Sequence, residues 1–189
     1  MAITSLSTSS LVSGVKRRRV WDQTATTDGF FQIATTTLNT TASSITFSSI
    51  PQDYTHLQIR GIWKVSSSGV LKMQFNSDTG ANYKAHYLAG DGSTAYANVT
   101  SVSPNAVGIG YVGASTAFLV SVCDILDYAN TNKYKTIRCL NGNDRNGAGD
   151  VELDSGVWLN TAAITSITLT PQTGTLSQYS SLALYGIKG

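Results

Sequence analysis

The side chains that could carry out acid–base or nucleophilic chemistry are few in this chain of 189 residues. There are two histidines, His56 and His86, and a single glutamate, Glu152. Hydrolases commonly hold a nucleophile in a G-x-S-x-G turn or a metal in an H-E-x-x-H helix, and neither motif occurs. His56 lies on the polar parity of its predicted strand, and His86 stands among tyrosines. We interpret both as surface or interface residues and predict no catalytic residues, no cofactor and no enzyme.

Residues 108–113 match the G-x-G-x-x-G motif of dinucleotide-binding folds. That motif works at the end of a strand that leads into a helix, because the helix N-terminus receives the pyrophosphate. Residues 116–126, which follow, are strand-like and not helical. We therefore predict a glycine-rich strand or bulge here and no nucleotide site.

Two loops carry oxygen-rich side chains that could suggest calcium. Asn141, Asn143 and Glu152 have the spacing of positions 1, 3 and 12 of an EF-hand loop, but Arg145 would stand at a ligand position. An arginine there repels a cation, so we predict a hairpin loop. Residues 76–80 read N-S-D-T-G, which an Asx-type turn explains. We predict no metal at either loop.

The two cysteines, Cys123 and Cys139, lie inside apolar runs and form no C-x-x-C spacing. We expect two buried free thiols and neither a disulfide nor a zinc site. No stretch approaches the length of an apolar membrane-spanning helix. Residues 1–15 lack the charge-then-apolar order of a secretory signal, so we expect synthesis in the cytoplasm and no membrane insertion.

Positive charge is concentrated near the N-terminus. Lys16, Arg17, Arg18 and Arg19 follow one another, and the first twenty residues contain no acid. From Phe30 onward there are nine basic and nine acidic residues, so the body of the chain is neutral. Because a nucleic-acid-binding surface usually has an excess of Lys and Arg, we predict no specific nucleic-acid site on the body.

Residues 1–29 mix serine and threonine with isolated apolar residues and have no sustained period, so we predict an extended basic arm. The cluster 16–19 has three open interpretations: a solvated tail, docking on an acidic protein surface, or contact with nucleic acid or membrane. In the docking interpretation Leu11, Val12 and Trp21 would contact apolar grooves of the partner.

The composition of the remaining chain favours strands. Serine and threonine account for 47 residues. Helix surfaces normally contain Glu, Lys, Gln and Arg, whereas Thr, Val, Ile and Tyr favour strands. Apolar residues alternate with polar ones in about ten short segments, and residues 117–126 are apolar on both parities, which predicts a central strand. We predict one all-β domain over residues 30–189, a jelly-roll-like antiparallel sandwich.

Four separated segments carry a resemblance: SITFSSIPQDYTHL at 44–57, FNSDTGANY at 75–83, DILDYANTNKYK at 124–135 and SLALYGIK at 181–188. Together they resemble a family of small virion structural proteins of tailed bacteriophages. The resemblance covers about residues 40–189 and leaves out the arm. It implies a non-enzymatic β-sandwich located on the virion, assembled in the host cytoplasm, and used in either the head or the tail.

Two functions follow from that resemblance. The first is a capsid-decorating (cement) protein that docks on the major capsid protein through its arm, as a homotrimer or higher homo-oligomer. The alternative is a tail- or fibre-associated module that binds a host surface glycan through loops 89–97 and 141–150. In that alternative Tyr83, Tyr87 and Tyr96 would stack on sugars. Trp63 and Trp158 could pack in the core or between subunits, and we favour the core for both.

Overall fold

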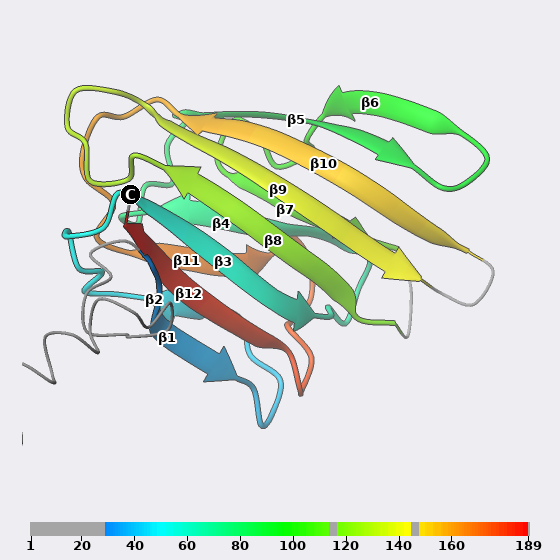
Figure 1. Ribbon diagram of the computed structural model, residues 1–189. Coiled ribbons are helices and arrows are strands. Elements are labelled where there is room, and N and C mark those ends of the chain that lie inside the picture. Colours follow the sequence, from blue (N-terminus) through cyan, green and yellow to red (C-terminus); the bar gives the residue numbers. More distant parts are fainter. Residues whose placement is uncertain (1–28, 114–116, 145–147, 189) are drawn as a thin grey trace, which may run out of the picture.

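The computed structural model describes residues 29–113, 117–144 and 148–188 (Figure 1). These residues form twelve strands and no helix, so no helix among them could cross a membrane. The strands are β1 (Gly29–Thr37), β2 (Ile45–Phe47), β3 (His56–Trp63), β4 (Gly69–Phe75), β5 (Tyr83–Gly90), β6 (Ala95–Val99), β7 (Val107–Val112), β8 (Leu119–Leu126), β9 (Lys135–Asp144), β10 (Gly149–Trp158), β11 (Ile167–Pro171) and β12 (Ser181–Lys188).

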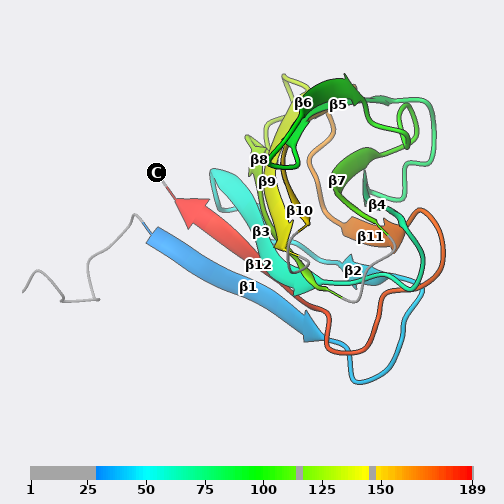
Figure 2. The same ribbon diagram turned by 90° about the vertical axis from the view of Figure 1, so that its right-hand side faces the viewer.

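The strands make two antiparallel sheets that pack face to face (Figure 2). The larger sheet has eight strands in the order β1-β12-β3-β8-β9-β10-β5-β6, and the smaller has four in the order β2-β11-β4-β7. Neighbouring strands are mostly distant in the sequence, as in jelly rolls and other Greek-key sandwiches. The predicted all-β sandwich is confirmed.

Alternation of apolar and polar residues explains why these segments form strands. In β4, Leu71, Met73 and Phe75 are fully buried, whereas Lys72 and Gln74 between them are partly exposed. Period-two patterning of this kind places every second side chain in the core between the sheets. Most buried apolar side chains of both sheets form one continuous cluster.

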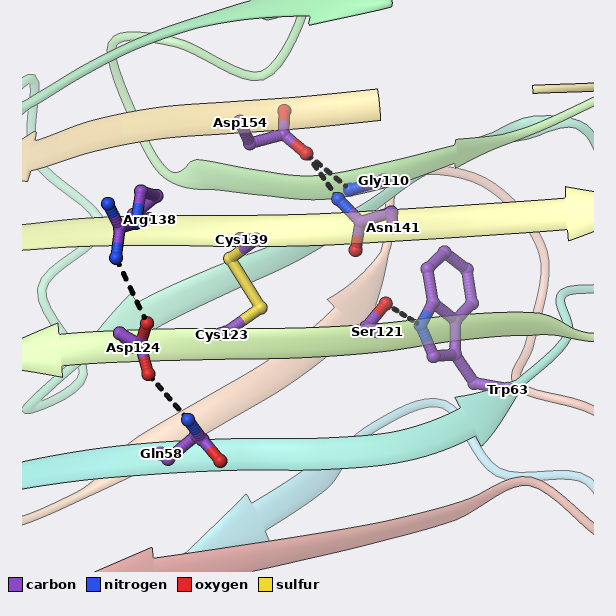
Figure 3. Close-up of a disulfide and its surroundings, with 10 residues drawn as sticks. All are labelled: Gln58, Trp63, Gly110, Ser121, Cys123, Asp124, Arg138, Cys139, Asn141 and Asp154. Atoms are coloured by element: carbon purple, nitrogen blue, oxygen red, sulfur yellow. Dashed lines mark hydrogen bonds and ion pairs between the residues drawn. A yellow bond between two sulfur atoms is a disulfide. The ribbon is translucent and has the colours of Figure 1, made fainter. Parts of the chain in front are cut away.

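Both tryptophans that were expected in the core are there. Trp63 is completely buried, and its Nε1 donates to Ser121 Oγ at 2.8 Å (Figure 3). Trp158 is 1% exposed, and its Nε1 donates to Asp78 Oδ2 at 2.7 Å. A buried indole N–H normally has a partner, and both rings satisfy that requirement within the chain.

The prediction of two free thiols is wrong, because Cys123 and Cys139 form a disulfide (Figure 3). The two residues lie directly opposite each other on β8 and β9, with 4.0 Å between their Cα atoms. Sequence spacing alone did not reveal this, because the pairing register of β8 with β9 is what brings the sulfur atoms together.

The central position predicted for residues 117–126 is confirmed, since β8 lies between β3 and β9. Its second apolar parity, however, is not buried. Val120 is 52% and Leu126 is 40% exposed, because no described element covers the outer side of the eight-stranded sheet.

The predicted arm, residues 1–29, falls almost entirely outside the described residues. The first described residue, Gly29, already belongs to β1 and pairs with Lys188 of the last strand, β12. The arm residues Leu11, Val12, Trp21 and the cluster Lys16, Arg17, Arg18 and Arg19 lie outside the part of the chain that the structure describes.

Candidate functional site

A pocket of about 310 Å³ opens at the edge of the sandwich where β6 and β7 are the last strands of their sheets. Strands β5, β6 and β10 of the larger sheet form one wall, and β4 and β7 of the smaller sheet contribute to the other. The lining residues are Val70, Tyr87, Ala89, Tyr96, Asn98, Val99, Thr100, Ser101, Tyr111, Asp150 and Glu152. Pockets that bind small organic ligands have this combination of aromatic walls and a few polar groups.

Three tyrosines supply the aromatic surface of the pocket. Tyr87 and Tyr96 meet edge to face with their ring centroids 6.2 Å apart, because inward positions of β5 and β6 are neighbours in the hairpin. Tyr111, which extends from β7, is 47% exposed. The Tyr96 hydroxyl donates to Asp150 Oδ1 at 3.3 Å. Partial burial, together with the negative charge of Asp150, raises the pKa of Tyr96.

Two of the three tyrosines proposed for sugar stacking are therefore in the pocket, and the third is not. Tyr83 is fully buried and stacks on Trp158 with ring centroids 6.3 Å apart. Its hydroxyl accepts from the backbone N–H of Phe75 and donates to the carbonyl of Asp78. Assigning Tyr83 to a glycan surface is wrong, because its ring is completely buried in the core beside Trp158 and Phe75.

Glu152 brings a buried carboxylate to the pocket wall. It is 7% exposed, and its Oε2 accepts from the backbone N–H of Tyr111 at 2.8 Å. Burial raises the pKa of this carboxyl, and the nearby charge of Asp150 acts in the same direction. A buried carboxylate accepts a hydrogen bond from a ligand hydroxyl or ammonium group more favourably than a fully hydrated carboxylate does.

Asp154 lies behind Glu152 on the same face of β10 and is sealed from solvent. Its Oδ2 accepts from the Gly110 backbone N–H at 2.9 Å and from Asn141 Nδ2 at 2.6 Å (Figure 3). Its Oδ1 is buried without a hydrogen-bond partner among the described residues. Burial, followed by the charge of Glu152, raises the pKa of Asp154 to about 8.

This pair of carboxyl groups suits binding better than acid–base chemistry. Glu152 lines the pocket, but Asp154 does not and is only 1% exposed. A general acid must reach the atom that it protonates, and Asp154 has no path to a ligand in the pocket. Asp154 instead holds the β7 backbone against β9 and β10.

The glycine motif at 108–113 explains how β7 can approach these side chains so closely. Its residues from Gly108 to Val112 belong to β7, and the register of β4 with β7 shifts between Val70 and Lys72. A Cβ on Gly108 would lie 2.3 Å from Thr100 Cγ2, and Gly110 has φ +81°. The prediction of a glycine-rich strand with a bulge is confirmed.

The remaining loop predictions can also be compared with the structure. Glu152 pairs with Asn141 across the β9–β10 hairpin, so the hairpin interpretation of that segment is confirmed. Asp78 Oδ1 accepts from the Gly80 N–H at 2.8 Å, which is the predicted Asx turn. Among the described residues, no three His, Cys, Asp or Glu side chains gather as metal ligands would.

The two loops predicted to bind a glycan lie next to each other. Much of loop 89–97 is the β5–β6 hairpin, and it faces the end of the β9–β10 hairpin across a shallow depression of about 450 Å³. The described lining residues are Gly90, Asp91, Gly92, Gly142, Asn143, Asp144, Ala148, Gly149, Asp150 and Val151. Asp150 is common to the depression and the tyrosine-lined pocket.

Sequence reasoning missed Tyr111, Glu152 and Asp154 as parts of this site. The signal was the parity of β10: Glu152, Asp154 and Trp158 share one side, and the tryptophan was already expected in the core. Because every second residue of a strand faces the same side, Glu152 and Asp154 are expected to face inward with Trp158. The histidines behave as expected for surface residues, since His86 is exposed and the half-buried His56 accepts through Nδ1 from the Asp127 N–H.

Comparison with known proteins gives no relative: no family model, no curated protein and no solved structure matches the chain.

Proposed function

We propose that this chain is a non-enzymatic structural protein of a tailed-bacteriophage virion, a capsid-decorating (cement) protein that docks on the major capsid protein through its N-terminal arm. The observation that carries the proposal is the contrast between body and arm. The body is a densely packed sandwich with equal numbers of acidic and basic residues from Phe30 onward, and four consecutive basic residues precede it. Electrostatic attachment to a large acidic partner is therefore assigned to residues 16–19.

The packing of the body fits a protein exposed on a particle. Most of its strand pairs join strands that are distant in the sequence, and one core cluster joins both sheets, so most strands of the described body cannot open without losing core contacts. Many copies on one particle would each need only a weak attachment, because repeated contacts add avidity.

The first experiment measures the number of copies in purified virions of the phage that encodes the chain, by quantitative mass spectrometry against the major capsid protein. Hundreds of copies support decoration of the shell. A few to a few dozen copies support a tail position, and absence from virions would overturn the proposal.

The second experiment tests the arm in the full-length chain. Replacing Lys16, Arg17, Arg18 and Arg19 by serine should abolish binding to heads that lack the protein, whereas the same number of substitutions in the body, at Lys64, Lys72, Lys84 and Lys133, should leave binding intact. Deletion of residues 1–20 should act like the arm variant. Undiminished binding of the arm variant would contradict the assigned role.

A second candidate, a tail-associated module that binds a host glycan, is favoured by one observation. Tyr87, Tyr96 and Tyr111 line a single pocket with Asn98, Asp150 and Glu152, and sugars are bound by stacking on aromatic rings with hydrogen bonds to amides and carboxylates. A glycan array probed with the full chain tests this candidate. Binding that is lost in Tyr96→Ala and retained in Tyr134→Ala would support it, since Tyr134 is 54% exposed and does not line the pocket.

A further inference from the structure

The outer face of the eight-stranded sheet is not covered by any described element (Figures 1 and 2). Two adjacent rows of apolar side chains cross this face from strand to strand, in register. The first row contains Val122, Leu140, Leu153, Leu88 and Ala97. The second contains Ile62, Val120, Val151 and Ala95, with Gly142 and Gly90 between them. We call these two rows the apolar face.

Six side chains of the apolar face are large and between 41% and 63% exposed. Leu140 is 57%, Leu88 is 56% and Val151 is 63% exposed. Together the rows present roughly 500 Å² of apolar surface, at the upper end of the patches that single-chain proteins leave in water. A standard protein–protein interface buries roughly 800 Å² on each side, so the apolar face is large enough to be the centre of one.

A third row, next to the apolar face, is polar and contains both signs of charge. Gln58 Nε2 donates to Asp124 Oδ1 at 2.6 Å, and the other oxygen of Asp124 lies 3.6 Å from Arg138 Nη2 (Figure 3). Apolar residues at the centre and polar residues at the rim are the arrangement found in specific interfaces. The rim contains the acid Asp124 and the bases Arg138 and Arg60, the last of which pairs with Val122 at the β3 end of the first row.

We propose that the apolar face binds the same face of a second copy of this chain, so that two eight-stranded sheets pack face to face around a two-fold axis. This inference does not depend on the proposed virion role. Three features favour an identical partner over another protein: the shape of the sheet face, the mixed charges of its rim, and the neutral body. A regular sheet face is complementary to another sheet face, since aligned sheets pack with their side-chain rows interdigitated.

The charges also favour a second copy. In a two-fold contact each surface meets its own equivalent, so a rim with both Asp124 and Arg138 can place the acid of one copy near the base of the other. The body is neutral, with nine residues of each sign from Phe30 onward, so two copies do not repel each other.

Face-to-face packing uses the whole apolar face of each copy and therefore joins two copies, not three. Association by this face alone differs from the homotrimer or higher homo-oligomer predicted for a capsid-decorating protein. A trimer would have to use another surface of the chain.

The test is the mass of the full-length chain in sedimentation equilibrium at micromolar concentrations. The wild type should have twice the chain mass of 20.0 kDa, and Leu140→Lys should have the mass of one chain. The matched control is Tyr134→Lys, because Tyr134 is 54% exposed and lies outside the two rows, and it should keep the doubled mass. Leu88→Ser, on a different strand, should weaken association in the same direction.

Circular dichroism on each variant establishes that it is folded, and Leu88→Ser replaces Leu140→Lys if the latter is not. A monomeric wild type, a trimeric wild type, or undiminished pairing of both face variants would overturn the inference. The two proposals can fail separately. A chain that pairs but is absent from virions overturns the virion role alone, and a monomer that is abundant on virions overturns the pairing alone.

Discussion

The two ends of strand β10 differ in what they place between the sheets. At the end with Trp158 the interior is aromatic and closed, with Tyr83 and Phe75 packed on the indole ring. At the other end the same face of the strand carries Asp154 and Glu152 and borders the tyrosine-lined pocket. One strand therefore provides core packing at one end and a polar pocket wall at the other. The comparison teaches that parity, and not polarity, decides which side chains face inward.

The largest effect should come from the closed end. Trp158→Ala removes a fully buried ring and leaves Asp78 without its indole donor, so we expect a loss of about 4 kcal/mol in the free energy of unfolding. Urea denaturation followed by circular dichroism measures the loss. A cost below about 1 kcal/mol would mean that the closed end is not tightly packed.

Lys135 tests how the closed end tolerates a charge. It faces Trp158 across the β9–β10 ladder, is completely buried, and its Nζ donates to the carbonyls of Asn130, Lys133 and Thr161. Burial lowers the pKa of this lysine. Lys135→Met leaves these carbonyls unpaired, so we expect a loss of about 3 kcal/mol in urea denaturation.

The neighbouring substitution Lys133→Met is the control for this lysine. Lys133 is 56% exposed and pairs only with Asp127 at the surface, so its replacement should change stability by less than about 1 kcal/mol. Equal losses for the two variants would show that the carbonyl contacts of Lys135 contribute nothing specific.

At the polar end the expected effect has the opposite sign. The pKa of Asp154 is raised to about 8, so the stability associated with its protonated form is complete below the ordinary value of 3.8 and is lost as the pH rises through about 8. Asp154→Asn imitates the protonated acid and keeps the contact with Gly110. The variant should melt at a higher temperature than the wild type at pH 9 and at a similar temperature at pH 4.

Thermal melts from pH 4 to pH 9 measure this difference, which grows by up to about 1.4 kcal/mol for each pH unit between about 4 and 8 and is constant above that range. Asp91→Asn is the control of opposite sign, because hydrogen bonds from Thr94 and Ser93 lower the pKa of Asp91. Its stabilising contribution is present above 3.8 and is lost as the pH falls. A flat pH profile for the wild type would contradict the burial of an acidic group at this end.

The smallest effect should come from the rim of the pocket. Tyr96→Phe removes only the 3.3 Å hydrogen bond to Asp150 at an exposed position, so the free energy of unfolding should change by less than about 0.5 kcal/mol. Urea denaturation checks this as well. A larger loss would mean that Tyr96 supports the fold and is not available for a ligand.

The sequence predicted the strands better than it predicted their surroundings. Period-two alternation predicted about ten short strands, because a strand with one buried face imposes that pattern locally. It could not identify the fully exposed β6, whose five residues show no buried face. The run that forms β8 was predicted to be a central strand. The sequence did not show that its outward apolar side chains are exposed, because their exposure depends on whether another layer covers the sheet.

The candidate site was predicted only in part, for the same physical reason. Tyr87 and Tyr96 come from one hairpin and are close in sequence, so their proximity could be anticipated. Tyr111 and Glu152 reach the pocket from strands that are distant in the sequence. The disulfide between Cys123 and Cys139 likewise depends on the register of β8 with β9, which the connecting turn and the buried parities set and which the spacing of the two cysteines alone does not show.

The pairing of Gly29 with Lys188 puts the point where the arm enters the body at one edge of the larger sheet, while the pocket lies beside β6 at the opposite edge. Seven strand-to-strand steps separate β1 from β6, which corresponds to roughly 30 Å across a twisted sheet. The hydrogen-bonded sheet thus keeps these two edges a fixed distance apart. If a particle held the chain by its arm, the pocket tyrosines Tyr87, Tyr96 and Tyr111 would lie at the opposite edge of the sheet from the attachment point.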